Sequence, residues 1–156
     1  MRASPAAFAA PATVMSALVL VACGGPYPGA TLGQQVQSWV RATGFTAAVG
    51  SLEADAARVR QVSPGDAGGL RTVCDVLVTD ALSANQNLPS PDTRLTTILT
   101  DAYRAAAAAG NGCLRAAGAA SGVPSRVAAD LAVARSGYIK AQARVDLLAL
   151  EGGGRR

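Results

Sequence analysis

The chain contains no histidine among its 156 residues, which limits the chemistry open to its other reactive side chains. Serine and cysteine hydrolases use a histidine base, and histidine is the commonest protein ligand of transition metals. Cys23, Cys74 and Cys113 are the only thiols, and a thiol nucleophile needs an activating base or cation nearby. No G-x-S-x-G motif or glycine-rich phosphate loop occurs. We therefore expect no enzyme, no catalytic residue, no metal site and no cofactor.

Five aspartates fall in segments with helical periodicity. A carboxylate glycosidase, or a metal site inside a helical bundle, needs acidic side chains on the inward face. Asp101 precedes Ala102 and Asp130 precedes Leu131, so both acids flank an apolar stripe. Arg104 is correctly spaced for a surface ion pair with Asp101. We expect all five on solvated flanks: Asp75, Asp80, Asp101, Asp130 and Asp146.

An uncharged, apolar stretch near the N-terminus ends in Leu20-Val21-Ala22-Cys23. This run resembles the lipobox of bacterial lipoproteins. In that class the cysteine is acylated and the preceding segment is removed, so the mature chain would begin at Cys23. Two alternatives are an uncleaved membrane helix and a plain secretory signal with an incidental cysteine. A length of roughly 20 residues is near the lower limit for a spanning helix.

The resemblance implies how the chain is organised and where it works. Residues 1–22 would be the signal peptide, and residues 23–30 the lipidated cysteine and a glycine- and proline-rich tether. The helical domain would span residues 31–151, followed by a flexible tail at 152–156. The lipid on Cys23 would hold the protein on the outer face of the cell membrane. The seven tether residues reach at most about 25 Å, so the domain would sit close to the bilayer.

Export also bears on the remaining cysteines. If Cys23 carries lipid, Cys74 and Cys113 form an even pair in an oxidising compartment, for which a disulfide is the natural interpretation. Two buried free thiols are the alternative. The cysteines are 39 residues apart. A disulfide closing such a loop contributes roughly 4 kcal/mol on the chain-entropy account.

Capping signals and break signals divide the domain into helical segments. Thr31 and Gln34 have the spacing of a capping box. Ser90, Pro91 and Asp92 give another start, with Ser90 as N-cap, Pro91 at the first helical position and Asp92 in the first turn. The other boundaries are Gly44, Ser63-Pro64-Gly65 followed by Asp66 as a cap, Gly118 to Pro124, and Gly152-Gly153-Gly154, with Gly50 and Gly110-Asn111-Gly112 as possible interruptions.

Apolar periodicity indicates the fold class. A wide apolar stripe from Leu70 to Leu82 is typical of a central helix. The last segment, from about Ser125 to Glu151, alternates apolar residues at spacings of four and three. No segment shows the period of two that strands require. We predict an all-α antiparallel bundle of four to five helices, closed by one disulfide. The apolar residues of the last segment are Val127, Leu131, Ala134, Tyr138, Ala141, Val145 and Leu148.

The proposed disulfide constrains the hairpin formed by the third and fourth helices. A symmetric hairpin turning near Leu88 would leave Cys113 about 16 Å along the helix from the residue opposite Cys74. Disulfide Cα atoms must lie within about 7 Å. Either the fourth helix bends back at residues 110–112, or the connection at residues 85–91 runs about 10 Å past the third helix. We favour the second route, because prolines extend the connection and Cys113 falls on the apolar face of the fourth helix.

Few side chains are suited to recognising a ligand or partner. Trp39 and Tyr103 are the most suitable aromatic residues, although Trp39 could instead anchor the core. Asn85 and Asn87 lie in the most polar connection, which is either a recognition loop or a capping turn. Tyr138 belongs to the apolar line of the last helix, so we expect a core residue with its hydroxyl at the edge.

Charge and chemistry together limit the function. The formal net charge is +4 and the charges are scattered, which disfavours nucleic acid as a partner. Our leading hypothesis is a lipid-anchored extracytoplasmic protein that binds an envelope protein or a small envelope ligand. The alternative is a structural or assembly accessory of the envelope. A closed core would favour the accessory, whereas an apolar cleft lined by Trp39 or Tyr138 would favour ligand binding.

Overall fold

The computed structural model describes residues 29–63, 65–119 and 123–153, and all regular structure in these ranges is helical. The all-α prediction is therefore confirmed. The expected signal peptide, Cys23 and most of the tether lie outside the described residues, as do residues 154–156. The helices are α1 (Leu32–Thr43), α2 (Phe45–Gln61), α3 (Ala67–Asn85), α4 (Thr93–Gly118) and α5 (Ser125–Gly153).

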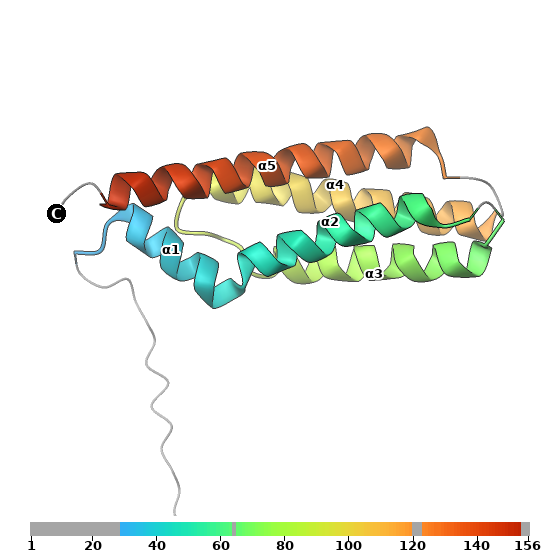
Figure 1. Ribbon diagram of the computed structural model, residues 1–156, viewed down its shortest axis with the longest axis horizontal. Coiled ribbons are helices and arrows are strands. Elements are labelled where there is room, and N and C mark those ends of the chain that lie inside the picture. The colour runs from blue at the N-terminus through green and yellow to red at the C-terminus, as the bar shows by residue number, and fades with distance from the viewer. Residues whose placement is uncertain (1–28, 64, 120–122, 154–156) are drawn as a thin grey trace, which may run out of the picture.

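The first two helices form one arm of the bundle, broken at a glycine. The predicted capping box at Thr31 and Gln34 is present, and Gly44 ends α1 with a φ of 62°. This left-handed conformation suits glycine and turns the chain directly into α2. Figure 1 shows the long helices side by side as a bundle, with α2 packed on α3 and α1 reaching the end of α5.

The start of α4 differs from the prediction. Asp92, rather than Ser90, is the N-cap, and the helix begins two residues later than expected, at Thr93. The Asp92 carboxylate accepts hydrogen bonds from the Leu95 amide at 2.6 Å and from the Arg144 guanidinium at 2.7 Å. These contacts satisfy a free amide of the helix and pair the buried charge, which makes Asp92 the better cap.

The α3–α4 hairpin follows the favoured route. A disulfide joins Cys74 to Cys113, whose Cα atoms are 5.8 Å apart, and α4 continues unbroken through residues 110–112. The connection after α3 runs past the end of that helix before α4 begins (Figure 1). A Cβ atom on Gly110 would lie 2.5 Å from a Val78 methyl group. Glycine therefore allows the close approach of α3 and α4 beside the disulfide.

The core confirms the periodicity of α5, whose seven predicted apolar residues are all buried. The stripe on α3 is narrower than predicted, because Leu82 is 54% exposed and turned away from the core, whereas Ala84 is buried. The end of α5 also differs, since the helix includes Gly152 and Gly153. A Cβ atom on Gly33 would collide with the Leu148 carbonyl oxygen and lie 3.2 Å from the Gly152 Cα, so Gly33 lets α1 approach α5 closely.

Candidate functional site

Trp39 joins α1 to the connection between α3 and α4. Its indole Nε1 donates a hydrogen bond to the Asn87 carbonyl at 3.0 Å, and its ring centroid lies 5.7 Å from that of Phe45. The Asn85 carbonyl accepts a hydrogen bond from the Leu88 amide at 3.2 Å, while the asparagine side chains are exposed. These backbone bonds are those of a helix-ending turn, which was one of the two interpretations of the connection.

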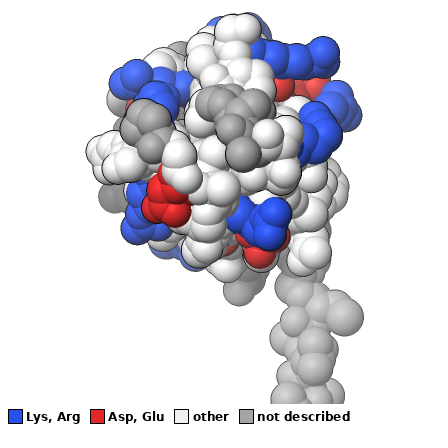
Figure 2. Space-filling view, turned by 90° about the vertical axis from the view of Figure 1, so that its right-hand side faces the viewer, with Lys and Arg blue, Asp and Glu red and all other residues white. Residues whose placement is uncertain are grey.

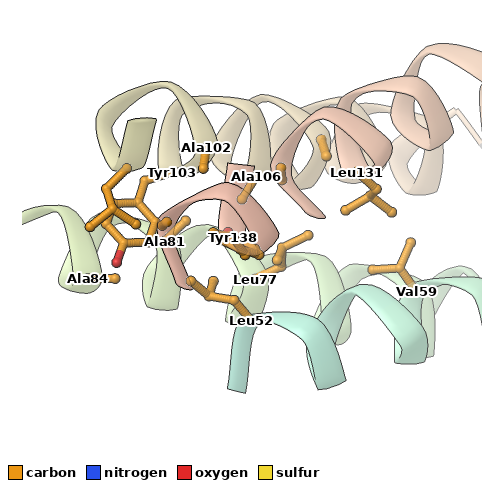
Figure 3. Packing of buried hydrophobic residues seen from close by; sticks show 14 of the residues in the cluster. Leu52, Val59, Leu77, Ala81, Ala84, Ala102, Tyr103, Ala106, Leu131 and Tyr138 are labelled. Carbon is orange, nitrogen blue, oxygen red and sulfur yellow. The ribbon is translucent and has the colours of Figure 1, made fainter. Parts of the chain in front are cut away.

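Tyr103 is a core residue. It is 3% exposed, and its ring centroid lies 6.0 Å from that of Tyr138. Figure 3 shows the side chain directed from α4 toward Ala81 and Ala84 of α3. Burial raises the pKa of the Tyr103 hydroxyl to about 12. Tyr103 therefore packs inside the bundle, and its role in recognising a ligand or partner stays a prediction.

A cavity of about 180 Å³ opens between α2 and α5. Leu77 of α3 and Ala106 of α4 also line it, and the other apolar lining comes from α2 and α5. Small side chains at Ala56, Ala106 and Ala134 leave the space that larger residues would fill. The remaining lining residues are Leu52, Glu53, Arg60, Leu131, Arg135 and Tyr138.

Tyr138, which lines this cavity, carries a buried polar group. It is 4% exposed, as expected of a core residue, but its hydroxyl has no hydrogen-bond partner among the described residues. Figure 3 shows the side chain directed from α5 toward Leu52 and Leu77. Burial, with smaller contributions from Tyr103 and Glu53, raises the pKa of the hydroxyl well above 10. The group therefore stays protonated and can donate a hydrogen bond.

Charged side chains surround the cavity. Arg60 and Arg135 are exposed, and neither forms an ion pair within residues 29–63, 65–119 and 123–153. Glu53 is the acidic lining residue. Elsewhere, on the end of the bundle that Figure 2 shows, charges of both signs lie in small, separate groups. Two guanidinium groups without an ion pair thus lie beside an apolar space that Tyr138 lines, and the Tyr138 hydroxyl is buried.

α2 carries a buried acid that we did not predict from the sequence. Asp55 is 3% exposed; its Oδ1 accepts a hydrogen bond from Arg58 at 2.8 Å, while Oδ2 has no partner among the described residues. Burial and the neighbouring Asp80 carboxylate raise the pKa of Asp55 above its usual value. Asp55 follows Leu52 by three residues and precedes Val59 by four. This spacing was a signal for the burial of Asp55.

The five aspartates considered in the sequence do not form an inward-facing cluster. Asp75, Asp101 and Asp146 are exposed, while Asp80 and Asp130 are half-buried. The predicted surface pair of Asp101 with Arg104 is present at 3.2 Å. No group of three acidic or cysteine side chains in the described part of the chain is arranged to hold a metal ion.

Comparisons with known proteins add no family to this description. Neither a protein-family model nor a curated protein or a solved structure matches the chain. Across the described ranges, no helix has both the length and the apolar character needed to cross a bilayer.

Proposed function

We propose that the protein is a lipid-anchored, extracytoplasmic binding protein for a small amphipathic acid, which occupies the cavity between α2 and α5. The unpaired Tyr138 hydroxyl is the observation that carries this proposal. Buried polar groups almost always have hydrogen-bond partners. A polar atom of a bound ligand would supply the missing partner, whereas the closed core expected of an accessory protein does not account for it.

The size and charge of the cavity define the class of ligand. Its volume is about 180 Å³, and an apolar cavity of about 150 Å³ accommodates benzene. A six-membered ring or a short acyl chain therefore fits. Arg60 and Arg135 would pair with an acidic group at the opening, since guanidinium is well suited to carboxylate and phosphate. The ligand would thus be apolar at one end and anionic at the other, and its anionic group would also accept the hydrogen bond from the Tyr138 hydroxyl.

The proposed location follows from the sequence near the N-terminus. The lipobox resemblance around Cys23 supports export and anchoring, and the Cys74–Cys113 disulfide is consistent with an oxidising compartment. A short tether would keep the cavity near the outer face of the membrane, where short acyl and aromatic acids would reach it from the envelope.

Titration with hexanoate, benzoate and uncharged hexanol, followed by amide chemical shifts, tests the proposal. We expect the acids to shift resonances of α2 and α5 at lower concentrations than hexanol does. Tyr138→Phe should weaken hexanoate binding about fivefold, as loss of one neutral hydrogen bond does. The double substitution Arg60→Gln with Arg135→Gln should weaken binding about tenfold, as loss of a charged hydrogen bond does.

Arg71→Gln is the matched control, because Arg71 is an exposed arginine outside the cavity lining. It should leave hexanoate binding unchanged. Ala56→Leu fills the cavity opening and should abolish binding while leaving the fold intact. If the acids cause no shifts, or if an ordered water satisfies Tyr138 in a chain that binds no acid, the proposal is wrong.

A further inference from the structure

α5 carries a second apolar face, opposite the one that packs in the core. Ile139 and Leu150 on this face are 60% and 75% exposed. At 100° per residue, an uncharged stripe about 80° wide runs along the outside of the helix. Isolated exposed apolar residues are ordinary, but a continuous stripe marks an interaction surface. The stripe consists of Ala132, Ser136, Ile139, Ala143, Leu147 and Leu150, all on one side of α5.

We infer that this stripe binds the same stripe of a second copy of the chain, with the two α5 helices antiparallel. A two-fold axis beside residue 141 places Ile139 opposite Ala143 of the second copy. The same axis places Leu150 opposite Ala132 of the second copy. Two-fold interfaces repeat each contact, so Ile139 and Leu150 each meet an alanine on both sides, while Leu147 lies level with Arg135 of the second copy and one residue from its Ser136. Such alternation allows two helices to pack closely.

The charges beside the stripe favour the same arrangement. Arg135 and Asp146 lie on one edge of the stripe, and the two-fold axis brings Arg135 within one residue of Asp146 of the second copy. Arg135 has no ion-pair partner among the described residues, and Asp146 accepts only the Gln142 side-chain amide, at 2.9 Å. A parallel arrangement would leave Arg135 about 16 Å along the axis from Asp146. In the antiparallel pair, two Arg135–Asp146 contacts on one edge oppose a single approach of Lys140 to Lys140 of the second copy on the other edge.

A second copy fits this face better than a lipid surface does. Helices that lie on membranes have tryptophan, phenylalanine or leucine on the apolar face and a polar face rich in lysine and arginine. The stripe contains no aromatic residue, and acidic Asp146 lies on the same edge as Arg135, with Lys140 on the opposite edge. None of the six stripe residues lines the cavity, whereas Arg135 on the edge of the stripe does.

Sedimentation equilibrium of the full chain carrying Cys23→Ser tests the interface. We expect the mass to rise with concentration from 15.5 kDa toward twice that value. Ile139→Glu should lower the association constant about tenfold or more, as loss of a central interface anchor does. Leu82→Glu, an equally exposed leucine on α3, should leave it unchanged. Arg135→Glu should weaken association, and adding Asp146→Arg should restore it.

Cross-linking tests the orientation of the helices in the same Cys23→Ser background. A mixture of Ile139→Cys and Ala143→Cys chains should form mixed disulfide-linked dimers in preference to either homodimer. A parallel pair would instead favour the Ile139→Cys homodimer and overturn the arrangement. A chain that stays monomeric to about 1 mM overturns the proposal, as does a dimer that Ile139→Glu leaves intact. Binding of the monomer to phosphatidylglycerol vesicles, lost in Ile139→Glu, would assign the stripe to lipid instead.

Discussion

Two buried aspartates in this bundle have opposite electrostatic environments. Asp55 is buried beside another carboxylate, which raises its pKa, whereas Asp92 is paired with Arg144, which lowers its pKa. Ionisation of Asp55 therefore destabilises the folded state, whereas ionisation of Asp92 stabilises it. Their contributions to stability change with pH in opposite directions.

Asp55 should make the protein less stable as the pH rises. The pKa of Asp55 is raised on folding. Its contribution to the stability of the fold is therefore fully present below pH 3.8 and is lost as the pH rises through the folded-state pKa. Asp55→Asn should stabilise the protein at pH 7 by about 1 kcal/mol, since an amide can donate to Asp80. Thermal unfolding at several pH values measures this. Asp75→Asn, an exposed acid on α3, is the control; a less stable Asp55→Asn at pH 7 would contradict the prediction.

Asp92 should stabilise the protein at neutral pH. Its pKa is lowered on folding, so its contribution is present above pH 3.8 and disappears as the pH falls through the lower folded-state value. Asp92→Ala removes both the helix cap and the charge, and should cost about 1 kcal/mol at pH 7. Asp92→Asn keeps a good cap and should cost less. Urea unfolding should show that the difference in free energy of unfolding between wild type and Asp92→Asn shrinks toward pH 2. A difference that stays constant with pH would exclude the ion pair as its source.

Among the elements, close helix contacts depend on individual glycines. A Cβ atom on Gly110 would lie 2.5 Å from a Val78 methyl group and 3.1 Å from the Cys74 carbonyl oxygen. Gly110→Ala should therefore destabilise the protein by about 1–3 kcal/mol, despite the better helix propensity of alanine. Gly50→Ala is the matched control, since nothing lies within 4 Å of a Cβ atom there. Gly50→Ala should stabilise the protein by about 0.5–1 kcal/mol. Thermal unfolding measures both variants, and equal effects at the two sites would refute the packing argument.

Local patterns predicted the helices well, and contacts distant in sequence explain the errors. The spacing of α5 is a property of one segment, so its buried face could be predicted from the chain alone. The start of α4 could not, because Asp92 is selected as cap by Arg144, which is 52 residues away. The cavity could not be predicted from the sequence either, since alanines from α2, α4 and α5 have to meet before the space beside Tyr138 exists.

For the whole molecule, the proposed ligand site and the proposed anchor depend on different parts of the chain. The cavity belongs to the bundle, whereas the anchor would depend on Cys23, outside the described residues. Loss of the lipid should therefore change where the protein is found without changing what the bundle binds. This separation makes the two proposals independently testable.

We expect Cys23→Ser to release the protein from the membrane fraction. Wild type should enter the detergent phase and carry the added mass of acyl chains, because two or more chains hold a protein stably on a bilayer. The variant should stay in the aqueous phase without lipid mass, and should unfold at the same temperature as the delipidated bundle. Detergent-phase partitioning and intact mass spectrometry measure both properties. If the two proteins partition alike and wild type carries no lipid, Cys23 is not an anchor, while hexanoate binding would still decide the function of the cavity.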